Sequence, residues 1–203
     1  MLMSILILTH KRPELFHRCL SSALKDIPAN IEILVNNDSR DIIEIPHSQV
    51  KYFYENPEHL SDKYKLLLDK STGEYIYYLE DDDYLVQNFY KIVLPYLKDY
   101  DVIGGNYYPT WNDEWVMRCT SSMSNSFNLD GAELQLGQFI MRRSIARTFQ
   151  FAKDSHIHND KRLVQHVYSL SKNPININKV LYFQTTDGGD NISFPESPNY
   201  YGF

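Results

Sequence analysis

The sequence predicts a single α/β domain in which a mainly parallel central sheet is flanked by helices. In the first half of the chain, short apolar runs alternate with amphipathic stretches, which is the pattern of β-α-β units. A chain of 203 residues is long enough for one well-buried domain. Its composition, 43% hydrophobic and 23% charged, is typical of a water-soluble fold and excludes a disordered chain.

The expected elements follow from these periodicities. Strands are predicted at 4–9, 31–36, 50–54, 74–79 and 102–105. A helix is predicted over Pro13–Leu24, because proline suits a first helical turn and the apolar residues that follow share one face. A second helix is predicted over 59–70.

After residue 105 the pattern weakens. We expect a strand at 114–119, helices at 143–149 and 160–170, and a last strand at 180–184. The tail from residue 187 is dense in Gly, Pro and Asn, so we expect it to wrap the surface or move.

Charge and cysteine content limit the classes of function. The net charge of −6 argues against general coating of nucleic acid, although residues 138–179 carry eight Lys and Arg against two acids. Cys19 and Cys119 show neither disulfide nor zinc spacing, which indicates a reducing, cytoplasmic compartment. The apolar opening 1–8 is too short to cross a bilayer, and no membrane insertion is expected. The sixteen tyrosines fit either a ring-binding site or a tyrosine-rich core.

An acidic run, Glu80-Asp81-Asp82-Asp83, directly follows the apolar stretch 75–79. Four adjacent carboxylates repel one another, and in parallel α/β sheets ligands bind at the carboxyl ends of strands. Mg²⁺ or Mn²⁺, held by carboxylates together with substrate phosphates, would relieve that repulsion. The alternative is an acidic turn that caps a helix beginning near Val86.

Three segments, 5–13, 33–41 and 73–83, follow one another at the ends of predicted strands. In order and spacing they resemble the nucleotide-sugar-binding half of family 2 glycosyltransferases of GT-A fold. The resemblance implies a GT-A-like single domain over 1–203, with a nucleotide-sugar-binding half at 1–105 and an acceptor-binding half with a C-terminal tail at 106–203.

The resemblance also implies roles for particular residues. Thr9 and Arg12 would face the nucleotide, and Lys63 would approach the nucleotide or its diphosphate. Asp82 would be the main metal ligand, with Asp83 in support and Asp81 toward the ribose. The residues expected to meet base and ribose are Asn36, Asn37 and Asp38.

Two departures from the family pattern matter. The family usually has an acid where Asn36 or Asn37 stands, often to bind a uracil N–H, so a base other than uracil stays open although a UDP-sugar is the expected donor. Many relatives place a histidine near the C-terminus as a further metal ligand, and no histidine follows His166 here. Asp187 or Asp190 would have to substitute, or diphosphate and water would complete the shell.

Inverting transfer needs a general base beside the acceptor hydroxyl. Relatives place a carboxylate at the start of a helix in the acceptor half, and Asp160 stands at the corresponding place. The segment 137–143 before it resembles the acceptor-side segment that leads to this helix in the family. The alternative for Asp160 is a helix N-cap.

The predicted function is therefore a metal-dependent, inverting glycosyltransferase that moves a sugar from a nucleoside diphosphate sugar to a hydroxyl. The acceptor is a saccharide or glycan, or, given the basic segment 138–179, a hydroxylated base in DNA. Two other classes stay open: a nucleotidyltransferase-like enzyme, for which the glycine-free loop after the first strand is unfavourable, and an inactive nucleotide-sugar-binding module. The oligomeric state is not indicated.

Overall fold

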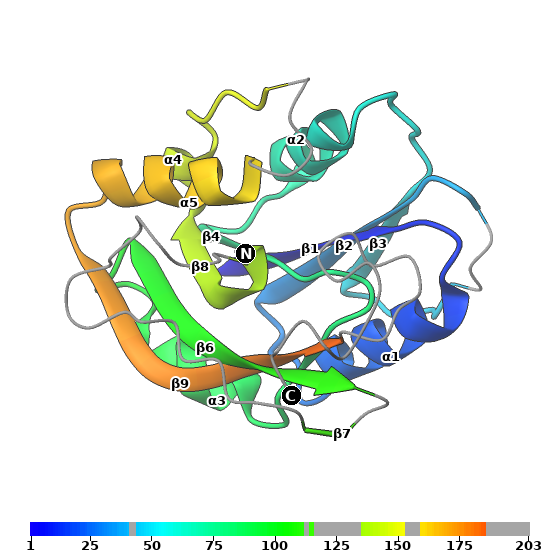
Figure 1. Ribbon diagram of the computed structural model, residues 1–203, viewed down its shortest axis with the longest axis horizontal. Helices are drawn as coiled ribbons and strands as arrows, with labels where there is room; N and C mark the ends of the chain where they lie inside the picture. Colours follow the sequence, from blue (N-terminus) through cyan, green and yellow to red (C-terminus); the bar gives the residue numbers. More distant parts are fainter. Residues whose placement is uncertain (41–43, 112–113, 116–134, 153–158, 186–203) are drawn as a thin grey trace, which may run out of the picture.

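The computed structural model describes residues 1–40, 44–111, 114–115, 135–152 and 159–185 (Figure 1). The strands are β1 (Met3–Thr9), β2 (Ile31–Asn37), β3 (Val50–Phe53), β4 (Tyr75–Tyr78), β5 (Tyr84–Leu85), β6 (Val102–Trp111), β7 (Glu114–Trp115), β8 (Phe139–Arg142) and β9 (Pro174–Thr185). The helices are α1 (Pro13–Leu24), α2 (Leu60–Lys70), α3 (Phe89–Val93), α4 (Arg143–Ala146) and α5 (Asn159–Leu170), with short 3₁₀ turns at Leu94–Tyr96 and Leu136–Gln138.

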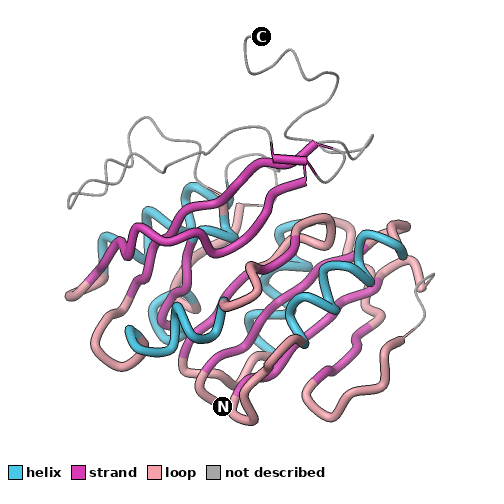
Figure 2. The backbone as a smooth tube through the Cα atoms, turned by 90° about the horizontal axis from the view of Figure 1, so that it is seen from below, coloured by secondary structure: helices cyan, strands magenta, loops and turns pink. Residues whose placement is uncertain are grey.

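Within the described residues the nine strands form one sheet in the order β3-β2-β1-β4-β8-β6-β9-β5, with β7 paired to β6. The strands from β3 to β4 are parallel, as predicted. Beyond β4 the sheet is mixed: β8 is antiparallel to both β4 and β6, whereas β9 runs parallel to β6 and antiparallel to β5. The long strands β6 and β9 curve together and curl this half of the sheet (Figures 1 and 2).

Helices cover both faces of the sheet (Figure 1). On one face, α1 and α3 pack over a core that includes Phe16, Leu20 and Val93. On the other face, α2, α4 and α5 enclose a second core that includes Leu67 and Val164. Because β1 and β2 are buried on both sides, their sequences are nearly continuous apolar runs, as expected for a central parallel sheet.

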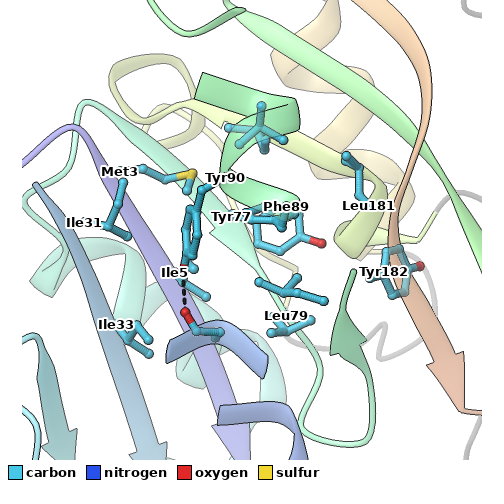
Figure 3. Packing of buried hydrophobic residues seen from close by; sticks show 14 of the residues in the cluster. Met3, Ile5, Ile31, Ile33, Tyr77, Leu79, Phe89, Tyr90, Leu181 and Tyr182 are labelled. Atoms are coloured by element: carbon cyan, nitrogen blue, oxygen red, sulfur yellow. Dashed lines mark hydrogen bonds between the residues drawn. The ribbon is translucent and has the colours of Figure 1, made fainter. Parts of the chain in front are cut away.

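Tyrosine makes up much of the core. Tyr75, Tyr77, Tyr78 and Tyr182 are among the largest fully buried side chains. Two of their hydroxyls have buried backbone partners: that of Tyr77 donates to the carbonyl of Gly137 at 2.7 Å, and that of Tyr78 donates to the carbonyl of Tyr64 at 3.1 Å. The Tyr182 hydroxyl has no hydrogen-bond partner among the described residues. Figure 3 shows Tyr90 making the same kind of bond to the carbonyl of Ala23. Many of the tyrosines thus serve packing, the second of the two roles left open by the sequence.

A buried carboxylate joins the amino-terminal ends of the central strands. Glu32, on β2, accepts hydrogen bonds from the Ser4 hydroxyl and the Thr72 N–H, each at 2.7 Å, and pairs with Lys51 at 2.8 Å. Burial alone would raise the pKa of Glu32, but the hydrogen bonds from Lys51, Thr72 and Ser4 outweigh it and lower the pKa to about 2. This network ties β1, β2 and β3 to the segment that precedes β4.

The second half differs from the sequence prediction in length and content. The strand predicted at 102–105 continues to Trp111, and the one predicted at 180–184 begins at Pro174. The helix predicted at 143–149 is only Arg143–Ala146, since the chain turns after one helical turn. Of the strand predicted at 114–119, Glu114–Trp115 is present and the rest lies outside the described residues. The strands β5 and β8 were not predicted, and the helix considered near Val86 begins at Phe89 as α3.

Candidate functional site

The carboxyl ends of β1, β2 and β4 meet at one edge of the sheet. Thr9, the last residue of β1, lies opposite Asn37, the last residue of β2. On the other side of β1, the N–H of Leu79 donates to the carbonyl of Leu6 at 3.0 Å, so the acidic run begins directly beside the end of β1. The residues that the sequence placed after three separate strands are thereby brought together, at the edge where parallel α/β sheets bind ligands.

Arg12 pairs with two carboxylates of the acidic run. Its Nη2 lies 2.8 Å from Oδ1 of Asp81, and its Nη1 lies 2.8 Å from Oδ2 of Asp82. The Asp81 side chain is fully buried, whereas that of Asp82 is 10% exposed. Burial raises the pKa of Asp81 to about 7, against the opposing effect of the Arg12 charge, and Asp82 adds to the rise. One guanidinium is therefore shared between two neighbouring carboxyl groups of the run.

Asp83 points toward the last strand. Its Oδ1 accepts the backbone N–H of Thr185 at 3.0 Å, and burial together with the neighbouring Asp82 raises the pKa of Asp83 well above its usual value. Arg18 reaches the same corner from α1, where its Nη2 donates to the backbone carbonyl of Asp82 at 2.9 Å.

A second charged cluster stands at the end of β2. Asp38 pairs with Lys63 from α2, and its Oδ1 lies 2.5 Å from Nδ1 of His10. Burial would raise the pKa of Asp38, but the hydrogen bonds from Lys63 and His10 lower it. The loop after β1, the loop after β2 and helix α2 are thus joined through one carboxylate.

Asn36 and Asn37 are both buried at the end of β2. Asn36 donates to the carbonyl of Glu55 at 2.9 Å, and Oδ1 of Asn37 accepts the N–H of Arg40 at 3.0 Å. Within the described part of the chain, Oδ1 of Asn36 and Nδ2 of Asn37 have no hydrogen-bond partner. Buried polar atoms are nearly always satisfied, so this acceptor and this donor indicate a ligand or solvent.

Asp160 lies in the first turn of α5, on the face of the sheet that α2 also covers. Burial raises its pKa to about 6. Its charge acts on Glu80, whose pKa is raised to about 8 chiefly by burial and then by Asp160. The Tyr64 hydroxyl donates to Oε1 of Glu80 at 2.9 Å, which places α2, the acidic run and the start of α5 around one polar region.

The chain matches the profile of glycosyl transferase family 2 over residues 4–162. It belongs to that family. The match spans all three strand-end motifs and reaches Asp160, so the resemblance predicted from 5–13, 33–41 and 73–83 is confirmed. No curated relative matches the chain.

Solved structures support the fold of this family 2 chain. The crystal structure of S. aureus TarS 1-349 in complex with UDP-GlcNAc has a TM-score of 0.77 and 17% identity, over 97% of this chain and 62% of that chain. The complex of the same protein with UDP has a TM-score of 0.72 and 17% identity, over 91% of this chain and 60% of that chain. This chain spans less than two thirds of those structures, and at 17% identity the likeness confirms the predicted α/β fold alone.

The atoms of the acidic run that could bind a divalent cation are carboxylate oxygens, the hard ligands that Mg²⁺ and Mn²⁺ prefer. Among the described residues, no three His, Cys, Asp or Glu side chains are grouped to hold a metal ion. Mg²⁺ commonly takes only one or two carboxylates and completes its shell with substrate phosphates and water. Asp82, whose side chain keeps 10% of its surface exposed beside the buried Asp81 and Asp83, fits that arrangement. Asp187 and Asp190 lie outside the described residues.

Several basic residues of the segment 138–179 contact other parts of the fold. Arg142 bonds Asp101 at 2.7 Å and Glu74 at 2.6 Å, and Arg143 donates to the carbonyl of Gly73 at 2.6 Å, so these two cations of the basic segment are engaged within the fold. His166 contacts the Thr148 hydroxyl at 2.7 Å, in keeping with a structural role. The segment 153–158 lies outside the described residues, as does Cys119.

Sequence reasoning missed four residues of this family 2 site: His10, Tyr64, Arg18 and Thr185. His10 directly follows Thr9 in the loop that was assigned to the nucleotide, but it was given no role of its own. Tyr64 was assigned only to the apolar face of its helix. Arg18 and Thr185 gave no signal, because their partners lie 64 and 102 positions away in the sequence.

Among the described helices, none has both the length and the apolar character needed to cross a bilayer.

Proposed function

We propose that the chain transfers a sugar from a nucleoside diphosphate sugar, a UDP-sugar being the expected donor, to a saccharide or glycan hydroxyl with inversion. One observation carries this: Arg12 bridges Asp81 and Asp82 at the joined ends of β1 and β4, in a chain of glycosyl transferase family 2. The site combines a cation-binding acidic run with polar groups from the two neighbouring strand ends.

The nucleotide is assigned to the ends of β1 and β2. Thr9, Asn37 and Asp38 border this region, and Lys63 brings a positive charge toward it from α2. The unpartnered Asn36 Oδ1 and Asn37 Nδ2 offer an acceptor and a donor, which complement the N–H and C=O groups of an imide such as uracil. That TarS was crystallised with UDP-GlcNAc and with UDP supports the same donor class here.

Asp82, with Asp83 in support, would hold Mn²⁺ or Mg²⁺ together with the donor diphosphate. When bound there, such a cation would supply positive charge against the negative charge that develops on the leaving diphosphate. Arg12 contributes a fixed positive charge to the same carboxylate, and its pairing keeps Asp81 and Asp82 in place before donor binds.

Asp160 is proposed as the general base. It accepts the proton of the acceptor hydroxyl while the hydroxyl oxygen forms a bond to the anomeric carbon and the bond from that carbon to the diphosphate oxygen breaks. A pKa of about 6 suits this role, because the carboxyl is then ionised near neutrality and still basic enough to take a proton.

The internal contacts of Arg142 and Arg143 favour an uncharged acceptor over a polyanion. Salt-dependent binding of DNA would instead support the hydroxylated base as acceptor.

The proposal is tested by a thermal-shift panel of nucleoside diphosphates, nucleotide sugars and nucleoside triphosphates with and without Mn²⁺. We expect UDP and UDP-sugars to raise the melting temperature more in the presence of Mn²⁺. A response to triphosphates alone would favour a nucleotidyltransferase. Donor binding without release of UDP from any acceptor mixture would favour a non-catalytic module.

A further inference from the structure

The carboxyl end of the last strand is bonded to the acidic run. Thr185 donates its backbone N–H to Oδ1 of Asp83 at 3.0 Å, and its hydroxyl donates to the backbone carbonyl of Asp82 at 2.5 Å. Thr185, Asp82 and Asp83 are all buried. Both bonds join residues more than a hundred positions apart, and both lie at the site rather than within a sheet ladder.

Arg18 completes the junction from α1. Its Nη2 donates to the carbonyl of Asp82 at 2.9 Å and to the Thr185 hydroxyl at 2.6 Å. The guanidinium carbon lies 4.7 Å from the centre of the Tyr84 ring, and Tyr84 in turn stacks on Phe183 of β9 with ring centres 4.9 Å apart. Because an arginine already held over an aromatic ring loses less freedom when it forms hydrogen bonds, Arg18 is well placed to fix this carbonyl.

The two arginines act on different parts of Asp82. Arg12 pairs with its carboxylate, whereas Arg18 and Thr185 hold its main chain. Since the carbonyl of Asp82 is held by a guanidinium and a hydroxyl, the peptide that links Asp82 to Asp83 has a fixed orientation. These contacts restrain the main chain from which the Asp82 side chain projects, while Arg12 restrains its carboxylate.

We propose that Arg18 and Thr185 are positioning residues of the donor site, which fix the main chain at Asp82 and Asp83 so that the Asp82 carboxylate faces the donor diphosphate. This inference rests on the proposed function. β9 is already held beside β5 by the pairing of Phe183 and Tyr182 with Tyr84 and Leu85. The bonds from Thr185 to the acidic run are additional to that pairing, and the proposal gives them a function at the site.

Thr185→Val tests the hydroxyl with little change in volume and keeps the N–H that bonds Asp83. Thr185→Ser restores the hydroxyl. Ser71→Ala is the control, since its buried hydroxyl likewise donates to a backbone carbonyl, that of Leu68 at 2.6 Å, but at the amino-terminal side of β4, away from the acidic run. The dissociation constants of UDP and UDP-GlcNAc with Mn²⁺ are measured by calorimetry, alongside the melting temperature of each variant.

We expect Thr185→Val to weaken donor binding about 3–10-fold, the effect of one lost hydrogen bond. Thr185→Ser should bind as the wild type does, and Ser71→Ala should lower the melting temperature without weakening donor binding. Equal affinity of Thr185→Val and wild type would overturn the positioning role. So would equal weakening by Ser71→Ala, because the effect would then be one of general stability.

Amide hydrogen exchange at 81–84, measured without donor, separates this inference from the proposed function. We expect faster exchange there in Thr185→Val and in Arg18→Met than in wild type, and unchanged exchange would overturn the positioning role whatever the protein binds. A wild-type protein that binds no nucleotide sugar would contradict the proposed function, while the exchange result would still decide the inference.

Discussion

Nη1 of Arg12 lies 2.8 Å from Oδ2 of Asp82, although the two residues are 70 positions apart in the sequence. The contact joins the loop after β1 to the end of β4 and places a fixed positive charge on the carboxylate proposed to hold a divalent cation. Charge balance at this edge of the sheet therefore depends on Arg12 before any donor arrives.

Replacing Arg12 by Met should destabilise the fold and weaken donor binding together. The change leaves Asp81 buried without its cation, which typically costs roughly 3 kcal/mol in the free energy of unfolding. Urea unfolding at neutral pH measures the loss. Lys65→Met is the control, because the exposed pair of Lys65 with Asp69 should contribute less than about 1 kcal/mol. Equal stability of the two variants would contradict the proposed charge balance.

Asp160→Asn should stop transfer and spare donor binding. Loss of a general base typically lowers turnover about 10²–10⁴-fold. In the wild type, turnover should fall as the pH drops through about 6, since Asp160 becomes protonated there. Steady-state rates across this range, with calorimetric donor affinities, check both statements. A variant that turns over at the wild-type rate would remove Asp160 from the mechanism.

The same substitution should raise stability at neutral pH. Because burial raises the pKa of Asp160 in the folded state, its ionisation favours unfolding as the pH rises from its usual value of 3.8 through about 6. The melting temperature of Asp160→Asn should therefore exceed that of wild type at neutral pH, and the difference should shrink as the pH falls from about 6 toward 3.8. A variant less stable than wild type at neutral pH would indicate a structural N-cap instead.

Glu32→Gln should destabilise the fold by roughly 1–3 kcal/mol at neutral pH, the range for hydrogen bonds to a charged group. The pKa of Glu32 is depressed to about 2, so its stabilising effect is present above its usual value of 4.5 and disappears as the pH falls toward 2. Urea unfolding across this range measures the difference between the two proteins. A difference that does not shrink with falling pH would show that shape, and not charge, is what Glu32 contributes.

The sequence was most informative where the chain is regular. The strands ending at Thr9 and Asn37 and the helix Pro13–Leu24 were predictable, because continuous apolar runs and a proline-initiated amphipathic pattern have few alternative structures. Their order then placed Arg12 and Asp82 at one edge of the sheet. This much of the site follows from parallel topology alone.

The curled half of the sheet was less predictable. The start of β9 alternates Ile175 and Ile177 with asparagines, a pattern typical of a half-exposed edge as well as of a loop. β8 is only four residues long and is recognised through its neighbours β4 and β6. The bonds from Thr185 to Asp83 and from Arg18 to Asp82 depend on how this half curls, and no local pattern encodes them.

The most direct test of the donor site is the release of UDP from UDP-sugars by the wild type and by Asp82→Asn, each with Mn²⁺ and with a chelator. We predict that the wild type releases UDP only with the cation, and that Asp82→Asn is slower by about a hundredfold or more, as expected for loss of a charge-stabilising group. Its melting temperature should stay close to that of the wild type. Equal rates for the two folded proteins, or a wild-type rate unaffected by the chelator, would contradict the account.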